Sequence, residues 1–492
     1  MNAGILSSWL QQRVLLVLLF AGVIGYGAFL WRHVSPYAGG SDPSGYLNSA
    51  RLLSQGALYT APRVLPGFSA REFGEFANVP LGFILREDER MVPTYPIGYP
   101  LHLFVAANFG WSRGVKALNV GIALASGLLL YAYCRKIGIT VGLALGGVAL
   151  LWACPLFIFS AVQPMSDLSA LGWSLVVLYS ALGARADWRW GLLCGAAVGI
   201  AVLVRPTNLL LAVPLLVALG LRFRSWWAVG LGGLPCAAFF CFYSWRLYGS
   251  PLATGYGDVS SLFRQEYLPR NLAHFSYWIP MLLSPLVVLA LAAPFVPAGR
   301  QRGLAVLAAW VFTLIGLYAF YYHSGETWWY LRFILPAFPA LIVATLVGLE
   351  EIWRRNPTRK LPVAFVLTGL LIAAIGWQLQ QIRERNVLNL KQDERCYLAS
   401  AQWVQQHLPD RSVIFCMQVS GAFYYYTDLV LFRWDQIVPE KMAPLLDAMA
   451  RQDRPVYAAL FSFETPEALE RIGGHWTKLV TVGQVTIWQR QP

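Results

Sequence analysis

Charge is scarce in this sequence. Only 13% of its 492 residues are charged, whereas 57% are apolar. So few polar side chains cannot cover a soluble globular protein, in which about 25% charged residues is usual. We therefore exclude a cytosolic enzyme. The seven cysteines include no CxxC pair, which leaves a zinc ribbon or a thioredoxin-like site without support.

The charge that is present is mostly positive. Lys and Arg number 38 against 25 Asp and Glu, which gives a formal charge of +13. These basic residues stand singly or in pairs between apolar runs and form neither an extended basic stripe nor an RNA-binding signature. We expect no nucleic-acid partner. Basic residues spaced in this way are typical of a membrane protein.

Long apolar runs dominate the first 380 residues. The first run, 14–31, follows Arg13. It is long for a signal peptide and no A-x-A cleavage site follows, so we interpret it as an uncleaved membrane span. Ten further segments bring the prediction to eleven spans: 115–134, 139–161, 167–184, 189–204, 207–222, 226–247, 278–297, 303–322, 331–351 and 361–379.

Basic residues in the short connections predict the orientation, because such residues accumulate on the cytoplasmic side. Alternate connections carry Arg135 and Lys136, Arg185 and Arg189, Arg222 and Arg224, Arg300 and Arg302, and finally Arg354, Arg355, Arg359 and Lys360. The opposite connections carry only Arg205 and Arg332. The N-terminus is therefore expected in the cytoplasm. Residues 189–222 are interpreted as two spans. A single span would place every later connection, with its basic residues, on the opposite side of the membrane.

Three segments are then extracytoplasmic: a first loop at about 34–114, a middle loop at about 248–277, and the tail from 381. The tail alternates helical stretches (394–407, and from Pro439 and Thr465) with runs typical of strands (SVIFCMQ, VYAALF and KLVTVGQVTIW). We predict two domains, a membrane domain over 1–380 and a small α/β domain over 381–492.

Two cysteines of the tail are candidates for a disulfide. Cys396 opens the expected helix and Cys416 ends the strand that follows it. An antiparallel return would bring these two ends together in an oxidising compartment. Other placements satisfy the same pattern, so the pairing is one hypothesis among several.

Carboxylates are also few between residues 97 and 380, and none is predicted at mid-membrane. Ion-coupled transporters usually hold ionisable groups at that depth, on broken helices of repeated halves. Neither feature is found here. The scarce acids instead favour a catalytic site at the outer water interface.

Two of those acids fall on the same outer side. Asp42 follows the first span, and Pro43 after it makes Asp42 a natural N-cap of a helix. Asp167 lies in the first turn of the span from 167, where the helix dipole alone favours an anion. If the two carboxylates meet, they can divide the work of general base and of metal or substrate positioning. No His or Cys constellation marks a transition-metal site, so any metal would be a divalent cation, Mg²⁺ or Mn²⁺, at Asp42 and Asp167.

The two outer arginines are the exceptions to the charge bias. Arg205 lies in VRPTN and Arg332 in WWYLRFILPAFP. Either side chain alone could extend to the phosphates of membrane lipids. Together they indicate an anion site at membrane depth, because arginine grips a phosphate through two parallel hydrogen bonds. Arg246 and Arg270, beside and within the middle loop, are weaker candidates.

The first loop ends in an apolar segment too short to cross a membrane. A hairpin is expected around 86–90, and TYPIGYP (94–100) then rigidifies the turn into PLHLFVAANFG (100–110). About 11 apolar residues are typical of a helix lying in the interface. His102 within this helix is interpreted as an interfacial polar residue rather than a metal ligand.

These motifs in this order resemble the GT-C superfamily of polytopic glycosyltransferases. The resemblance extends over about 350 residues and is closest to bacterial members related to protein O-mannosyltransferases, lipid A aminoarabinose transferase and Rgt-type lipopolysaccharide sugar transferases. Its marks are Asp42 with Tyr46 and Ala50, YPIGYP, PMSD, Arg205, YGSPLATGY and RFILPAFP. One departure is Pro43, since many relatives have Glu after the first Asp.

The resemblance implies an inverting transferase that takes sugar from a polyprenyl-phosphate donor to a lipid-, glycan- or protein-linked acceptor. It implies Asp42 as the base, Asp167 as the second acid, and Arg205 and Arg332 as contacts of the donor phosphate. The side chains expected to position the substrates are Tyr46, Tyr95, Tyr99, His102 and Glu326. The implied location is a bacterial inner membrane, with the active site and the tail in the periplasm.

Two other functions stay open from the sequence. One is a lipid or polysaccharide transporter with a receptor-like tail, which should show internal repeats or polar residues within several spans. The other is an oligosaccharide ligase, which would share the outer active face but take a preassembled glycan from a pyrophosphate carrier.

Overall fold

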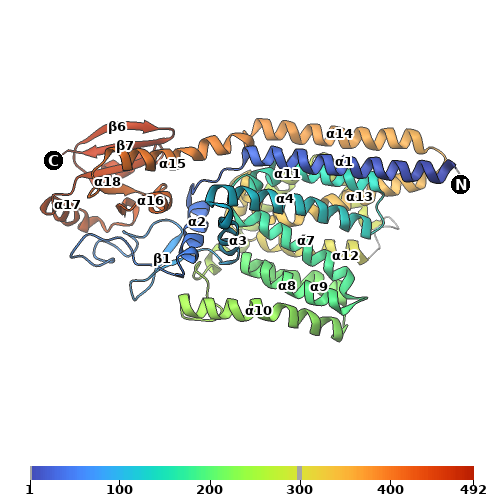
Figure 1. Ribbon diagram of the computed structural model, residues 1–492, viewed down its shortest axis with the longest axis horizontal. Coiled ribbons are helices and arrows are strands. Elements are labelled where there is room, and N and C mark those ends of the chain that lie inside the picture. The colour runs from blue at the N-terminus through green and yellow to red at the C-terminus, as the bar shows by residue number, and fades with distance from the viewer. Residues whose placement is uncertain (1–2, 296–301, 492) are drawn as a thin grey trace.

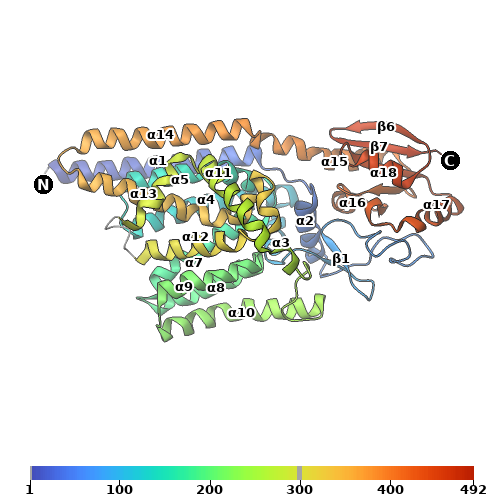
Figure 2. The ribbon, with the colours of Figure 1, turned by 180° about the vertical axis from the view of Figure 1, so that it is seen from behind.

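The computed structural model describes residues 3–295 and 302–491. Figure 1 shows an elongated molecule, with a bundle of long helices at one end and a small domain with a sheet at the other. The described chain begins at the far end of the bundle and ends in the small domain. Seen from behind, in Figure 2, α2 and α3 again lie between the two parts.

Every segment predicted as a span is mostly helical over its described residues, with short breaks in some of them. The helices of the bundle are α1 (Ala3–His33), α4 (Trp111–Lys136), α5 (Val141–Trp152), α6 (Pro155–Ala161), α7 (Ser166–Ala184), α8 (Trp188–Val204), α9 (Ala212–Leu219), α10 (Phe223–Tyr248), α11 (Leu268–Leu283), α12 (Arg302–Tyr318), α13 (Phe338–Arg355) and α14 (Lys360–Glu384). The 3₁₀ segments η2 (Pro206–Leu211) and η8 (Trp328–Ala337) lead directly into α9 and α13, and η5 (Pro285–Phe295) follows α11 after a sharp bend. Arg300, one of the basic residues used for orientation, lies outside the described residues.

Several of these helices are long and apolar enough to cross a membrane. By length and composition five qualify within the described residues, or seven if each of two bent pairs is one span. The bends measure 61° between α5 and α6 and 109° between α11 and η5. Pro155 and Pro285 begin the second member of each pair, as expected where proline interrupts a helix. Shorter apolar helices cover 188–204, 206–219 and 302–318.

The first loop contains two helices and a hairpin. These are α2 (Ser41–Ser54), α3 (Gly98–Ala106), and the antiparallel strands β1 (Phe83–Leu85) and β2 (Met91–Pro93). The predicted hairpin and short apolar helix are therefore present. The N-cap prediction for Asp42 is wrong: Gly40, at φ +49°, occupies that position and Asp42 lies in the first turn. Glycine tolerates this backbone, so α2 starts two residues early and the Asp42 carboxylate is free to pair elsewhere.

The connection predicted at 248–277 is shorter than expected. α10 extends to Tyr248 and ends at Gly249 in the left-handed region, while α11 already begins at Leu268. A glycine in that conformation is a common helix terminator.

The tail contains the helices and the small sheet expected of it, and is referred to below as the C-terminal domain. Its elements are α15 (Leu390–His407), β3 (Val413–Cys416), α16 (Ser420–Tyr426), β4 (Val430–Arg433), α17 (Met442–Arg451), β5 (Val456–Phe461), α18 (Thr465–Ile472), β6 (Trp476–Val482) and β7 (Val485–Arg490). The sheet order is β4-β3-β5-β7-β6, in which β3 is parallel to both neighbours and β7 antiparallel to both of its own. β4 and α16 were not anticipated from the sequence.

The predicted disulfide is not formed, since Cys396 and Cys416 are both free. Cys396 lies within α15 and packs against Gly483, in the turn that joins β6 to β7. Cys416 ends β3, and β5 lies between β3 and β7. The helix thus crosses the sheet away from the end of β3 instead of returning beside it.

Candidate functional site

An ion pair joins the first loop to the last part of the bundle. Asp42, in the first turn of α2, lies with Oδ2 at 2.8 Å from Nη2 of Arg332 in η8. The Asp42 side chain is 25% exposed and that of Arg332 14%. The carboxylate is therefore the more accessible partner.

A second ion pair lies deeper. Asp167, in the first turn of α7, accepts from Nη2 of Arg205, with 2.6 Å between Oδ1 and the nitrogen. Arg205 ends α8 in an extended conformation because Pro206 follows it. The Asp167 side chain is only 1% exposed. A buried carboxylate of this kind depends on its guanidinium partner.

The two pairs form one charged cluster. The guanidinium carbons of Arg205 and Arg332 lie 5.4 and 5.3 Å from the centre of the same Phe333 ring. The charges of Asp42, Asp167 and Arg205 all act on Arg332. The four polar residues that the sequence singled out are thus brought together at one place.

The cluster holds hydrogen-bond donors that the protein itself does not use. Arg332 Nη1 lies 3.2 Å from the sulfur of Met165, a weak acceptor. Nε of Arg332 and Nη1 of Arg205 are buried and lack a hydrogen-bond partner within the described chain. Buried donors are rarely left without a partner. An anion between the two arginines would satisfy both.

Three tyrosines enclose the cluster on the side of the first loop. Tyr46 donates to Ser166 Oγ at 2.7 Å, Tyr99 donates to Asn119 Oδ1 at 2.9 Å, and the hydroxyls of Tyr95 and Ser41 lie 2.7 Å apart. The Tyr46 ring lies 4.8 Å from that of Tyr95 and 5.1 Å from that of Tyr99. Burial, with the charge of Asp42, raises the pKa of Tyr46 and of Tyr95. Both hydroxyls therefore stay neutral at physiological pH.

Sequence reasoning missed part of the site. Phe333 and Met165 contact the arginines, and Tyr256 lies 6.1 Å from Tyr95, ring centre to ring centre. Each belongs to a motif already noted, namely RFILPAFP, PMSD and YGSPLATGY. Their apolar or aromatic side chains gave no chemical signal of their own.

His102 lies beside the cluster rather than in it. Its Nδ1 lies 2.7 Å from the Gly98 carbonyl oxygen, and Trp173 donates to its Nε2 at 3.1 Å. Burial lowers the pKa of His102, so the ring is neutral and can accept this bond. It lines an apolar cavity of about 490 Å³ between α3, α4 and α8, together with Leu203, two residues before Arg205.

The remaining candidates make their contacts elsewhere. Arg246 is exposed and lies 5.7 Å from the Tyr59 ring. Arg270 donates to the carbonyl of Tyr322, and Glu326 lies 3.0 Å from Nδ1 of His323. Of the four arginines named for the donor phosphate, Arg205 and Arg332 are the two in the cluster.

The described residues of the cluster offer few free ligands for a divalent cation. Asp42 and Asp167 each pair with an arginine, and within the described residues no group of three or more His, Cys, Asp or Glu could hold a metal ion. We therefore assign no step of the chemistry to a metal.

The C-terminal domain packs on the helix that carries Asp42. The backbone nitrogen of Ala38 donates to the Tyr426 hydroxyl at 2.9 Å, and the Asn48 side chain donates to the Gly421 carbonyl at 2.9 Å. Gly421 leaves no space for a side chain against Ser44 of α2. The position of α2 therefore depends on both domains.

Comparisons with known proteins identify the fold. No family model matches the chain, and no curated protein matches its sequence. Solved structures do match, and they are GT-C glycosyltransferases. The chain has their fold, as the sequence resemblance predicted.

Three of these structures illustrate the likeness. ArnT from Cupriavidus metallidurans bound to undecaprenyl phosphate is 14% identical, with a TM-score of 0.62 over 97% of this chain and 99% of that one. The archaeal oligosaccharyltransferase AglB from Archaeoglobus fulgidus, in complex with an inhibitory peptide and a dolichol-phosphate, is 12% identical, with a TM-score of 0.56 over 97% and 74%. The arabinofuranosyltransferase AftD from Mycobacteria is 12% identical, with a TM-score of 0.58 over 96% of this chain and 41% of AftD.

Proposed function

We propose that this protein is an inverting glycosyltransferase that moves a sugar from a polyprenyl-phosphate donor to an acceptor hydroxyl. The observation that carries the proposal is the cluster of two Asp–Arg pairs with unused guanidinium donors. Such a cluster offers a base and an anion site at one place. The GT-C fold supports the same reaction class, because the similar structures are transferases of sugars or oligosaccharides.

The donor phosphate would bind between Arg205 and Arg332. Their unpaired Nη1 and Nε atoms suit a phosphate monoester, and charge-assisted hydrogen bonds of this kind are strong. ArnT and AglB were solved with undecaprenyl phosphate and dolichol-phosphate. The apolar cavity beside Leu203 would accommodate the first isoprene units of the lipid.

The reaction then needs one proton acceptor and one stabilised leaving group. A phosphate that draws Arg332 away from Asp42 frees the Asp42 carboxylate to take the proton of the acceptor hydroxyl. The acceptor oxygen attacks the anomeric carbon from the face opposite the phosphate, so the configuration inverts. The bond from that carbon to the phosphate oxygen breaks, and the two arginines compensate the charge left on the lipid phosphate. Asp167 holds Arg205 in place for this role.

The proposal includes the cellular placement. The positive charge of alternate connections puts the N-terminus in the cytoplasm and the cluster, with the C-terminal domain, on the outer face of a bacterial inner membrane. The acceptor is a lipid, glycan or protein on that face. Chelation with EDTA tests whether transfer needs a divalent cation, and we expect unchanged transfer.

The test is a transfer assay with purified protein. Wild type should consume a polyprenyl-phosphate hexose or pentose in the presence of envelope extract, and Asp42→Asn should lose transfer while expressing normally. Asp258→Asn is the matched control, since this carboxylate lies in an exposed loop and accepts from the backbone of the nearby Ser260. Wild-type turnover in Asp42→Asn would remove Asp42 from the mechanism. Competition between monophosphate and pyrophosphate lipids separates the transferase from an oligosaccharide ligase.

A further inference from the structure

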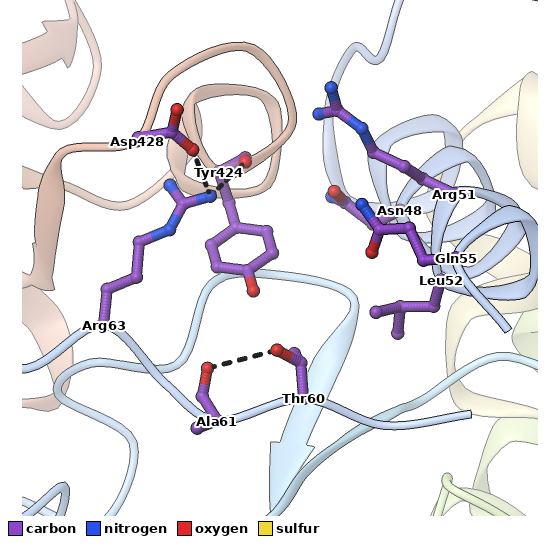
Figure 3. Close-up of a pocket in the computed structure, with 9 residues that line it drawn as sticks. All are labelled: Asn48, Arg51, Leu52, Gln55, Thr60, Ala61, Arg63, Tyr424 and Asp428. Atoms are coloured by element: carbon purple, nitrogen blue, oxygen red, sulfur yellow. Dashed lines mark hydrogen bonds and ion pairs between the residues drawn. The ribbon is translucent and has the colours of Figure 1, made fainter. Parts of the chain in front are cut away.

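A second cavity lies between α2 and the C-terminal domain. Its volume is about 340 Å³. In Figure 3, side chains of α2 face Arg63, Tyr424 and Asp428 across it, and Thr60 and Ala61 form the floor in this view. Both domains are therefore needed to form this cavity.

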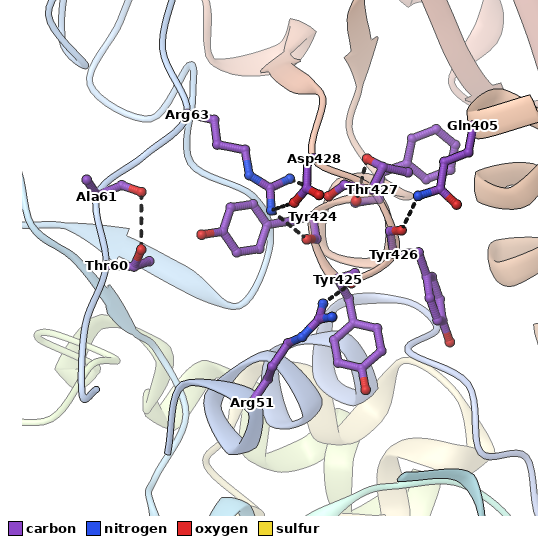
Figure 4. Close-up of polar contacts among 11 residues, drawn as sticks. Arg51, Thr60, Ala61, Arg63, Gln405, Tyr424, Tyr425, Tyr426, Thr427 and Asp428 are labelled. Carbon is purple, nitrogen blue, oxygen red and sulfur yellow. Dashed lines mark hydrogen bonds and ion pairs between the residues drawn. The ribbon is translucent and has the colours of Figure 1, made fainter. Parts of the chain in front are cut away.

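Two arginines are fixed at its walls by the end of α16. Arg51 donates to the Tyr425 carbonyl, and Arg63 donates to the carbonyls of Thr427 at 2.6 Å and Tyr424 at 3.2 Å. Figure 4 shows both guanidinium groups turned toward this turn of the chain. The carbonyl end of a helix attracts cations, which explains why both side chains are held there.

The cavity carries an excess of positive charge. Among its described lining residues the one carboxylate is Asp428, which lies 3.3 Å from Arg63 and is fully exposed. Arg51 is exposed, and its charge acts on Arg63. One positive charge is therefore left without a counter-ion, and its field reaches the cavity.

The other lining groups can form hydrogen bonds with the hydroxyls of a ligand. Asn48, Gln55 and Thr60 bring amide and hydroxyl groups to the cavity, and the Tyr424 ring lies 4.1 Å from the guanidinium carbon of Arg63. Amides and guanidinium groups can bind the hydroxyls and the carboxylate or phosphate of a sugar. We propose that this cavity binds an anionic saccharide that belongs to the acceptor.

The inference rests on the proposed function, because α2 both lines the cavity and carries Asp42. At a rise of about 1.5 Å per residue, Asn48 lies about 9 Å along α2 from Asp42, and Gln55, just past the end of the helix, about 20 Å. A sugar in the cavity can present a hydroxyl to Asp42 only as part of a longer molecule. The acceptor is then an extended glycan and not a free monosaccharide, and the C-terminal domain contributes to its recognition.

The test is calorimetric titration of the full-length protein in detergent with trigalacturonate. The comparison ligands are its neutral methyl ester and inorganic phosphate. We expect trigalacturonate to bind. The methyl ester should bind about tenfold more weakly because it loses a charge-assisted hydrogen bond, and phosphate about tenfold more weakly because it lacks the sugar contacts. No binding of trigalacturonate, or equal binding of the ester or of phosphate, would overturn the proposal.

Two variants and a control locate the binding. Arg51→Gln should weaken binding about tenfold, and Gln55→Ala severalfold. Within the described residues the exposed Gln55 side chain forms no hydrogen bond to the C-terminal domain, so Gln55→Ala should keep the fold. Arg451→Gln, at the exposed end of α17, should bind as wild type does. Unchanged binding in both cavity variants would place the saccharide elsewhere.

The outcome is independent of the transferase test. Titration needs no turnover, so absent binding with Asp42-dependent transfer would reject this cavity and keep the enzyme. Binding without any transfer would reject the enzyme and leave a saccharide site.

Discussion

Asp42 and Arg332 form an ion pair in which Oδ2 lies 2.8 Å from Nη2, although one belongs to the first loop and the other to the last part of the bundle. The pair holds the proposed base against a proposed donor contact before any substrate arrives. Arg332 also keeps a buried nitrogen without a partner in the described chain. A phosphate can therefore bind Arg332 and release Asp42 in the same event.

The donor contact makes a prediction for Arg332. Arg332→Gln should raise KM for the polyprenyl-phosphate sugar at least tenfold and lower kcat as well, because both binding and leaving-group stabilisation lose a charge-assisted bond worth about 1.5–3 kcal/mol. Initial rates over a donor series measure both constants. Arg246→Gln is the matched control, since Arg246 lies near Tyr59. Equal donor KM in both variants would contradict the assignment.

The deeper pair predicts a stability effect. Asp167→Asn should destabilise the protein by about 3 kcal/mol, because it leaves the Arg205 charge buried without its carboxylate. Asp167→Asn with Arg205→Gln should be more stable than the single variant yet inactive. Thermal unfolding in detergent, followed by tryptophan fluorescence, measures the stability of both variants. Transfer assays measure the activity of the double variant. A double variant no more stable than Asp167→Asn would show that the charge of Arg205 is not the cause of the loss.

The contact between domains predicts a role for Gly421. A side chain there would meet the Leu81 carbonyl oxygen at 2.8 Å, as well as Ser44 of α2. Gly421→Ala should therefore displace α2 and lower kcat, with little change in donor KM. The matched control is Gly369→Ala in α14, where nothing lies within 4 Å. A wild-type kcat in Gly421→Ala would mean that α2 does not need this support.

Glu394 predicts a pH dependence of stability. Its carboxyl packs against Gly39, three residues before Asp42, and Oε2 has no hydrogen-bond partner in the described chain. Burial, with the nearby Asp393, raises the pKa of Glu394 from its usual 4.5 to about 7. The folded state thus holds the proton more tightly than the unfolded state. Stability should fall as the pH rises from about 4.5 to about 7 and then level off.

The variant Glu394→Gln isolates that effect. It should unfold at a higher temperature than wild type at pH 8, since no carboxylate has to be charged in the folded protein. The difference should shrink as the pH falls toward 4.5 and disappear below it, where the wild-type carboxyl becomes protonated in both states. Melting temperatures across this range provide the measurement. A difference that does not change with pH would mean that Glu394 does not titrate there.

The bundle and the members of the charged cluster could be predicted from the sequence, because apolar length and charge position are local signals. The pairing of each arginine with its aspartate could not be predicted. Which arginine meets which aspartate depends on how four distant segments pack, and no local pattern encodes it. Phe333 and Met165 were missed for the same reason.

The C-terminal domain shows the same limit. Strands β3, β5, β6 and β7 were predicted from apolar runs, whereas β4 was not anticipated. The disulfide between Cys396 and Cys416 was wrong because the path of α15 over the sheet is a tertiary property. Gly421 packs against α2, although the two are far apart in the sequence, so only the folded structure reveals this contact.

The central claim is that Arg205 and Arg332 hold the donor phosphate beside Asp42. A structure of the protein with bound undecaprenyl phosphate tests it most directly. We predict the phosphate between the two guanidinium groups, bonded to Arg205 Nη1 and Arg332 Nε, with Asp42 released from Arg332. A phosphate bound away from both arginines, with the Asp42–Arg332 pair intact, would contradict the account.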